Sequence, residues 1–308
     1  MAKILFITRR YRVNTDRLKL LITSAEYGSL TKAGKELGYS QSAMTQMVKH
    51  LEDEVGFPLL IRTNKGVELT KEARMLLPTM RQLLRDEEIF KQEVSEIRGI
   101  HKGTIRIGSF ISTSMHWLPS VLEFFQNNYP DVIISIEECG EEEMIEGLRS
   151  GSMDMALMAD PMLSDIEFIP LYEDPMVVAF TPDYYDLRGY TNVPLEDIRN
   201  LPFLLTEATY DKDARQTFIN AGIEPNVKFT SKNDFAVMSM VQRGIGIAIL
   251  PELVIDGYEG NYEYRLLEPE YYRTLGIGVM SERNSGPLAR FLIDFLTDNV
   301  RKQIGSEI

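Results

Sequence analysis

The sequence predicts a mixed α/β chain in three parts: an N-terminal helix-turn-helix unit with a β-hairpin wing, one long helix, and a two-lobed α/β region. Short helical patterns separated by glycine turns open the chain, a heptad of apolar residues follows, and strand and helix patterns alternate from residue 103. With 308 residues, the chain is long enough for more than one compact part. We divide it into an N-terminal extension (1–13), a winged helix-turn-helix domain (14–69), a dimerisation linker helix and hinge (70–102), and the α/β region (103–308).

Three helices are expected in the first part. Residues 15–26 carry an apolar stripe behind a cap at Asn14 or Thr15, residues 30–37 end at Gly38, and a third helix runs from Ser40 to about Val55. Two short helices joined by a tight turn form a helix-turn-helix, whose second helix can enter the major groove of DNA. Residues 59–62 and 66–69 then predict a hairpin wing.

The long helix is predicted by apolar residues that recur at four- and three-residue steps from Leu69 to Ile97, interrupted only by Glu87. Such a stripe over four heptads favours a partner helix, although packing on its own domain would also explain it. Pro78 should kink this helix or lie near its start. The candidate dimerisation residues are Leu76, Met80, Leu83, Phe90 and Val94.

The α/β region is expected to form two lobes with a cleft between them. Strands at 104–108, 132–137 and 153–158 with helices at 114–127 and 141–149 predict the first lobe, which covers about 103–174 and 273–301 through a returning strand (275–280) and helix (287–301). Strands at 176–180, 203–206, 227–230 and 247–250 with helices at 212–221 and 234–243 predict the second lobe, about 175–272.

Charge divides the chain in the same way. The net charge of −13 conceals a basic start, with 11 Lys and Arg against 7 Asp and Glu in residues 1–69, and an acidic body, with 16 against 33 in residues 99–308. This asymmetry is typical of a basic module that binds a polyanion such as DNA, joined to an acidic region that a polyanion repels. Chance surface composition is the alternative explanation.

Composition limits the remaining possibilities. The longest apolar runs fall far short of the roughly 18 to 20 residues that span a bilayer, and the apolar stretch at residues 4–7 is too short for a signal peptide. We therefore expect a cytoplasmic protein without membrane contact. The chain has a single cysteine, Cys139, and 3 histidines, so neither an internal disulfide nor a zinc site is expected, and no metal or cofactor is predicted.

Several segments resemble the LysR-type transcriptional regulator family, in order along the chain from about Asn14 to Arg301. The segments are GSLTKAG at 28–34, SQSAMTQ at 40–46, 51–52, 55–56, 59–62, 69–73, 122–125, 129–132, LRSGSMD at 148–154 and GIGIAILP at 244–251. The N-terminal block is the most specific of them. The resemblance implies a homo-oligomer, commonly a tetramer, that binds double-stranded promoter DNA, works with RNA polymerase, and responds to a small-molecule effector. The α/β region would then resemble periplasmic binding proteins.

The polar side chains of the third helix are the candidates for reading DNA bases. Amide, hydroxyl and ammonium groups on one helix face can address base edges, and side chains of the wing and the helix before it are better placed for phosphates or the minor groove. The first group is Gln41, Ser42, Thr45, Gln46 and Lys49, and the second is Thr31, Arg62, Asn64 and Lys65. Ser40 has an equally good explanation as a helix cap.

A hydroxyl-rich turn follows the first strand of the α/β region and is the candidate effector site. Ser109, Phe110, Ser112 and Thr113 open a helix at the carboxyl edge of a sheet, where backbone amides favour an anion or a carbonyl group. Simple helix capping would also explain these residues. Across the cleft we expect Thr206 and Asn233 of the second lobe to contribute. Asp160 follows the third strand near the expected crossing between the lobes and is a further candidate, although it could be only a turn residue before Pro161.

Two other classes of protein are the alternatives. A solute-binding protein would explain the two lobes but needs an export signal and has no use for a basic N-terminal unit. An enzyme would need a nucleophile, an acid–base pair or a cofactor motif, and the sequence shows none that we recognise. We therefore expect a regulator and not an enzyme.

Overall fold

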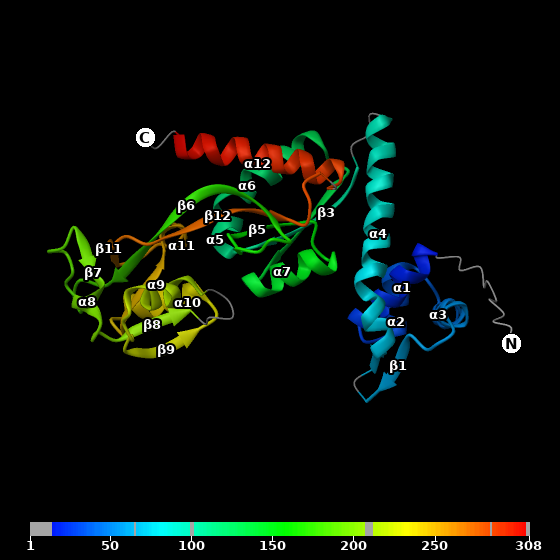
Figure 1. Ribbon diagram of the computed structural model, residues 1–308, viewed down its shortest axis with the longest axis horizontal. Helices are drawn as coiled ribbons and strands as arrows, with labels where there is room; N and C mark the ends of the chain where they lie inside the picture. Colours follow the sequence, from blue (N-terminus) through cyan, green and yellow to red (C-terminus); the bar gives the residue numbers. More distant parts are fainter. Residues whose placement is uncertain (1–13, 65, 99–101, 207–211, 284, 306–308) are drawn as a thin grey trace, which may run out of the picture. The chain divides into compact units, whose positions relative to one another are not determined.

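A computed structural model describes residues 14–64, 66–98, 102–206, 212–283 and 285–305. The expected N-terminal extension and Lys65 lie outside these residues. The chain divides into two compact units with the boundary between Lys91 and Gln92. Helices and strands are mixed as predicted: the first unit is mainly helical with a small hairpin, and the second is an α/β unit (Figure 1).

Unit 1 is a three-helix unit followed by a hairpin and the start of a long helix. Its elements are α1 (Thr15–Glu26), α2 (Leu30–Leu37), α3 (Gln41–Val55), β1 (Leu60–Thr63), β2 (Gly66–Leu69) and α4 (Lys71–Ile97), the last of which continues into unit 2.

The helix boundaries of unit 1 follow from local capping. The side chains of Asn14, Ser29 and Ser40 accept hydrogen bonds from backbone N–H groups in the first turns of α1, α2 and α3. Gly38 and Gly56 end α2 and α3 in the left-handed conformation. The sequence predicted each of these helices within one or two residues because the capping signals are local.

The apolar stripe of α4 is divided between two environments. Met80, with 6% of its surface exposed, packs with Leu18, Leu21 and Leu59 in the core of unit 1, whereas the other four candidate dimerisation residues are exposed, Phe90 to 64%. Met80 is therefore a core residue of unit 1, which corrects its place among the candidate dimerisation residues. A heptad pattern cannot distinguish the buried position from the exposed ones. Apolar residues recur at the same spacing whether a helix packs on its own domain or on a partner helix.

The start of α4 also differs from one of the expectations for Pro78. Thr70 accepts a hydrogen bond from the Ala73 backbone N–H at 3.1 Å and donates one to Pro58 O at 3.0 Å, so that the helix begins directly after β2. Pro78 then lies inside the helix and not near its start.

Unit 2 alternates strands and helices. Its first elements are β3 (Gly103–Ser109), α5 (Ile111–His116), α6 (Leu118–Asn128), β4 (Val132–Glu138), α7 (Glu141–Ser150), β5 (Met155–Ala159), β6 (Glu167–Phe180), β7 (Asn192–Pro194), α8 (Leu195–Ile198) and β8 (Phe203–Thr206). The others are α9 (Asp213–Ala221), β9 (Val227–Ser231), α10 (Asp234–Gln242), β10 (Ile247–Pro251), α11 (Glu252–Ile255), β11 (Glu263–Glu268), β12 (Tyr272–Val279) and α12 (Pro287–Gly305).

One hydrogen-bonded sheet runs through the described part of unit 2 in the order β4-β3-β5-β12-β6-β10-β8-β9, with β11 and β7 beside β6. β3, β4 and β5 are mutually parallel, as are β8, β9 and β10, but β6 and β12 are antiparallel to their neighbours. The two long strands join a first lobe to a second (Figure 1). The described part of unit 2 accordingly has separate cores, one hydrophobic cluster in the first lobe and two in the second.

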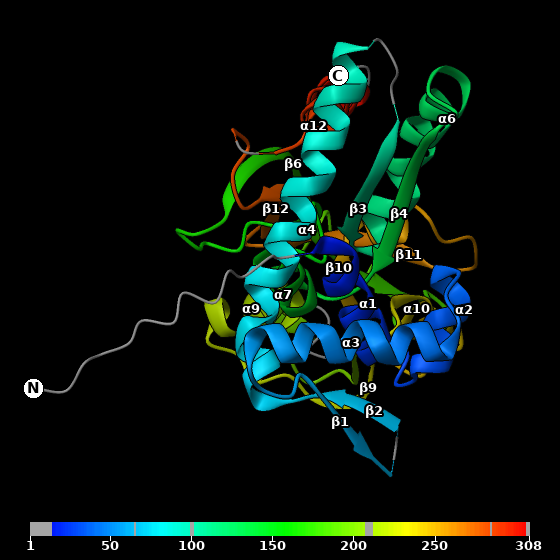
Figure 2. The same cartoon turned by 90° about the vertical axis from the view of Figure 1, so that its right-hand side faces the viewer.

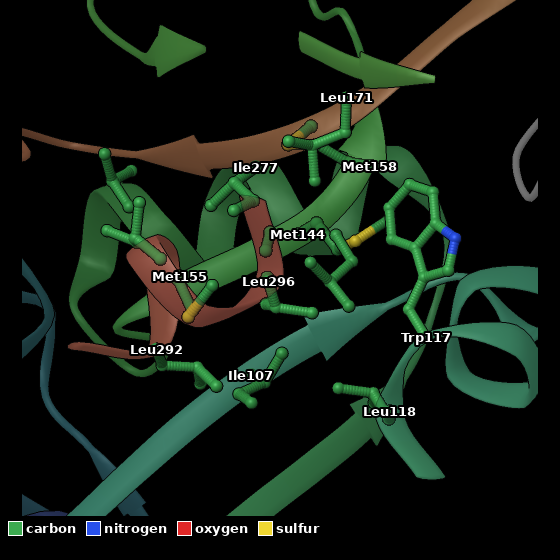
Figure 3. Close-up of a cluster of buried hydrophobic side chains, with 14 of the residues drawn as sticks. Ile107, Trp117, Leu118, Met144, Met155, Met158, Leu171, Ile277, Leu292 and Leu296 are labelled. Atoms are coloured by element: carbon green, nitrogen blue, oxygen red, sulfur yellow. The ribbon is translucent and has the colours of Figure 1, made fainter. Parts of the chain in front are cut away.

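The core of the first lobe is rich in methionine. Met144 from α7 and Met155 and Met158 from β5 lie among Ile107, Ile277 and side chains of α12 (Figure 3). α6 and α12 lie over one face of this sheet and α7 over the other (Figure 1). These buried methionines fill space between the layers.

The short elements β7, α8 and α11 and the strand β11 were not predicted. Two predicted elements of unit 2 have different bounds for local reasons. The single helix expected at 114–127 is two helices, α5 and α6, because Pro119 in the first turn of α6 has no N–H to continue the ladder of the preceding helix. β6 begins at Glu167, well before the predicted 176, since Pro170 and Pro175 hide an extended segment from strand patterns. No helix within the described residues is long and apolar enough to cross a membrane.

Because Met80 is buried and Leu83 is exposed, the two residues should respond differently to truncation. We expect Met80→Ala to lower the free energy of unfolding of unit 1 by about 2 to 5 kcal/mol through the cavity it leaves. Leu83→Ala should change the stability of the monomer by less than about 0.5 kcal/mol. Urea unfolding of a fragment that covers residues 1–98 measures both, and equal losses would contradict the division of the stripe.

Candidate nucleic-acid interface and ligand site

The predicted base-reading side chains share the exposed face of α3. Met44, Val48 and Leu51 turn into the core of unit 1, so that the opposite face of the helix meets solvent. The exposed residues on that face are Gln41, Ser42, Thr45, Gln46 and Lys49. Two hydroxyls already have partners, because Thr45 donates to Gln41 O at 3.0 Å and Ser42 lies 3.0 Å from the capping hydroxyl of Ser40. The Ser40 hydroxyl accepts from Ala43 N–H at 3.3 Å, which agrees with its explanation as a helix cap.

The wing is attached to both ends of the helix-turn-helix. The Glu52 carboxylate of α3 accepts hydrogen bonds from the backbone N–H groups of Leu59 at 2.7 Å and Leu60 at 3.1 Å. At the other strand, Val67 N–H donates to Gly28 O at 2.9 Å, in the turn between α1 and α2. The hairpin is thus fixed beside α3 (Figure 2). Glu52 lies within the family resemblance but had no predicted structural role, because a half-buried carboxylate in a helix looks like any solvated one.

A groove of about 690 Å³ lies between α3 and the wing, and its lining includes Thr45, Lys49 and Arg62. Thr31, Arg62 and Asn64 are exposed, as expected for groups that would contact phosphates. The arrangement combines amide and hydroxyl groups on a helix with cations beside them. Chemically it suits a duplex, with side chains for base edges flanked by phosphate ligands.

The hydroxyl-rich turn after β3 is buried and internally bonded. The Ser109 and Thr113 hydroxyls lie 2.8 Å apart, and each also lies 3.0 Å from the carbonyl oxygen of Phe110. Phe110 precedes α5 without providing a side-chain cap. Neither Ser112 nor Thr113 caps α5 in this structure, so the capping alternative does not explain the turn. A ligand could use the hydroxyls of Ser109 and Thr113 only by replacing bonds that they already make.

An arginine that no sequence pattern singles out meets this turn. The Arg273 guanidinium donates to Asp174 at 2.9 Å, to Ser112 Oγ at 3.1 Å and to Asp213 at 3.5 Å, and it lies 5.5 Å from the centre of the Phe110 ring. The side chains of Arg273 and Asp174 are 3% and 0% exposed. Asp174 also accepts from Leu253 N–H at 3.0 Å, so that both charges are held by additional hydrogen bonds.

Two ion pairs join the first lobe to α9 of the second. Arg273, on β12, contacts Asp213 at the start of α9, and Lys212, the residue before it, lies 2.7 Å from Glu141 at the start of α7. Both ion pairs therefore lie at the N-terminal end of α9. The effector candidates of the first lobe therefore lie beside charged groups from the second, and the local carboxylates outnumber the two cations.

The other three effector candidates have local partners. Thr206 donates to the buried Asp234 of its own lobe, and Asn233 caps α10 by accepting from Ala236 N–H at 3.2 Å. Asp160 accepts from Met162 N–H at 2.9 Å, which agrees with its alternative explanation as a turn residue. That these three residues contact an effector stays a prediction.

The environment of the single cysteine, Cys139, keeps its thiol protonated. Cys139 is buried, and burial together with the nearby carboxylates of Glu137 and Glu143 raises the pKa of its thiol to about 11. A thiol of this pKa is protonated at neutral pH and a poor nucleophile. Among the described residues, no group of three or more His, Cys, Asp or Glu side chains is arranged to hold a metal ion.

Comparison with known proteins gives two family matches. Residues 15–74 match the family described as bacterial regulatory helix-turn-helix protein, lysR family, and residues 98–301 match the LysR substrate binding domain. The chain is 28% identical over 281 residues to YvbU, an uncharacterized HTH-type transcriptional regulator of Bacillus subtilis, covering 90% of this chain and 96% of the relative.

Solved structures share the fold. A full-length OxyR variant from Pseudomonas aeruginosa superposes with a TM-score of 0.74 at 22% identity, covering 94% of this chain and 95% of that one. Full-length CbnR complexed with its target DNA gives a TM-score of 0.65 at 21% identity, covering 94% and 100%.

Because Glu52 is the acceptor for two backbone groups of the wing, we expect Glu52→Ala to destabilise unit 1 by about 1 to 3 kcal/mol. Glu36→Ala, at an exposed position of α2, is the matched control and should cost less than about 0.5 kcal/mol. Denaturant unfolding gives the stabilities, and hydrogen exchange should show faster exchange at Leu59 and Leu60 only in the Glu52 variant. Unchanged exchange at these two amides would disprove the anchoring role.

The buried pair at the turn should behave as a unit. Removing one partner, in Asp174→Leu or Arg273→Met, leaves an uncompensated buried charge and should cost about 3 to 5 kcal/mol. The double variant should recover most of that loss. Trp117, the only tryptophan and part of the first-lobe core, reports unfolding by fluorescence; additive losses in the double variant would show that the two charges do not compensate each other.

Proposed function

The chain belongs to the LysR family of bacterial regulatory proteins, and from this premise we propose that it regulates transcription by binding promoter DNA through α3 and the wing. The exposed polar face of α3 beside the anchored hairpin is the observation that carries the proposal. Its side chains, from Gln41 to Lys49, would address base edges, while Thr31, Arg62, Asn64 and Lys65 would meet phosphates or the minor groove.

Self-association forms part of the same proposal. Leu76, Leu83, Phe90 and Val94 expose apolar surface along α4 and would pair with the same helix of a second chain. A tetramer has support from the two ends of the unit 2 sheet, where Ile133 on β4 and Phe229 on β9 are 63% and 53% exposed. Two or more DNA-binding units would then contact neighbouring half-sites of a promoter. In the cytoplasm, the bound oligomer would recruit RNA polymerase to that promoter or exclude it.

Effector binding is the third element of the proposal. We place a small molecule between the turn at residues 109–113 and the second-lobe groups near Thr206 and Asn233, with Asp160 of the first lobe beside the crossing between the lobes. The helix start favours the anion that the sequence suggested, but Arg273 already faces two carboxylates, so that an anion would rely on backbone amides and hydroxyls. A ligand that binds two arrangements of the lobes unequally would shift their populations, and no catalytic step is needed.

DNA contacts should separate into specific and general ones. On an operator selected from random duplexes, Gln41→Ala is expected to cost about 1 to 3 kcal/mol while random DNA is bound as before. Arg62→Ala should weaken binding to every duplex and lower the slope of log affinity against log salt by about 1. Fluorescence anisotropy at several salt concentrations measures both, with Glu36→Ala as control. If wild-type protein binds no selected duplex, the regulator proposal is wrong.

The exposed half of the α4 stripe should control self-association. Leu83→Asp places a charge where a partner helix would bury it and is expected to shift the chain from oligomer to smaller species, with both units folded. Glu93→Asp, an exposed position on the same helix, is the control. Sedimentation velocity should show the change, and an unaltered sedimentation coefficient for Leu83→Asp would exclude α4 as the main interface.

A further inference from the structure

The end of α4 that belongs to unit 2 contains a buried glutamine. Gln92 is 7% exposed, and its side-chain Nε2 donates to the backbone oxygen of Thr104 at 3.3 Å, in the second residue of β3. A buried amide of this kind has to keep its hydrogen bond, since an unpaired one carries the full cost of desolvation. The contact therefore fixes the position of the helix end relative to the strand.

Tight packing surrounds this contact. Gly103 has a φ of +152°, and a Cβ at that position would lie 3.0 Å from Gln92 Cγ and 3.1 Å from Leu288 Cδ1. Leu288 is buried near the start of α12. Side chains of α4 and α12 thus meet at Gly103 of β3. The boundary between the compact units falls just before Gln92, so the residues from Gln92 to Ile97 belong to unit 2 although α4 runs unbroken from Lys71.

β3 connects this contact to the ligand turn. The strand runs from Gly103 to Ser109 and is hydrogen-bonded along its length to β4 and toward its end to β5. One end meets Gln92, and the other is Ser109, whose hydroxyl belongs to the proposed effector site. A strand of this length spans about 20 Å, and pairing on both sides limits its bending.

We propose that Gln92 is a positioning residue that couples the first lobe of the effector-binding unit to α4, so that changes at the turn of residues 109–113 reach the helix through β3. The role of the turn rests on the proposed function, whereas the coupling of α4 to β3 does not. Without the Gln92 contact, residues 92–97 would be free to move relative to the first lobe. With it, this end of the helix turns together with the first lobe.

Pulsed electron spin resonance on the full chain tests the coupling without an effector. Nitroxide labels are placed at Glu96→Cys on α4 and Asp294→Cys on α12, both exposed positions, while the native Cys139 is buried. Gln92→Met keeps the length of the side chain but removes the donor, and Gln92→Ala also removes its bulk. Glu93→Ala, at the exposed neighbouring position, is the control.

The distance distribution between the labels should be narrow in the unmodified background and in Glu93→Ala, and about twofold broader in both Gln92 variants. Hydrogen exchange of the amides at residues 93–97 should be about tenfold faster in the same variants, with Trp117 fluorescence unchanged. If Gln92→Ala fails to fold, Gln92→Met decides alone. An equally narrow distribution and unchanged exchange in Gln92→Met would overturn the proposal.

Affinity for random duplex DNA, measured on the same samples, keeps the two proposals apart. Retained affinity in Gln92→Met together with a broadened distribution supports the coupling and leaves the DNA-binding unit intact. A wild-type chain that shows the narrow distribution but binds no duplex would remove the proposed function and leave the coupling of α4 to β3 in place.

Discussion

The antiparallel pairing of β6 with β12 is the constraint on which unit 2 depends. These strands are the only links in the described sheet between the β3, β4 and β5 group and the β8, β9 and β10 group. At their crossing, Arg273 pairs in register with Asp174, and their side chains form the buried ion pair that reaches Ser112 and Asp213. The strand connection and the polar contact between the lobes therefore occupy the same place, and a change in the angle between lobes has to pass through it.

Much of unit 1 could be predicted from the sequence because its signals are local. Ser29, Ser40, Gly38 and Gly56 mark helix ends through bonds and backbone angles that involve only their own turns. The exposed face of α3 follows from its helical period, since Met44, Val48 and Leu51 fix the buried side. The family resemblance added what periodicity could not, namely the expected role of that face.

The rest depended on contacts between distant residues. The hydrogen bond between Arg273 and Ser112 spans 161 positions, and no pattern near either residue announces it. Met80 looks like its heptad neighbours until the core of unit 1 is seen to close over it. Gln92 shows how a polar residue in a helix can be buried with a partner that follows it in the chain, here β3. Segments with proline, such as the first half of β6, were missed because propensities describe the residue and not the neighbour with which it pairs.

The division of α4 has a consequence for genetics. Ala73 and Met80 complete the core of unit 1, so the DNA-binding unit includes helix residues that follow the wing in the sequence. A premature stop codon just after the wing would produce a fragment without these side chains, which could not fold stably enough to occupy an operator. Such an allele should behave as a simple loss of function. A stop codon after α4, by contrast, would leave the core and the exposed stripe intact, and its product could compete with the complete protein as a dominant-negative allele.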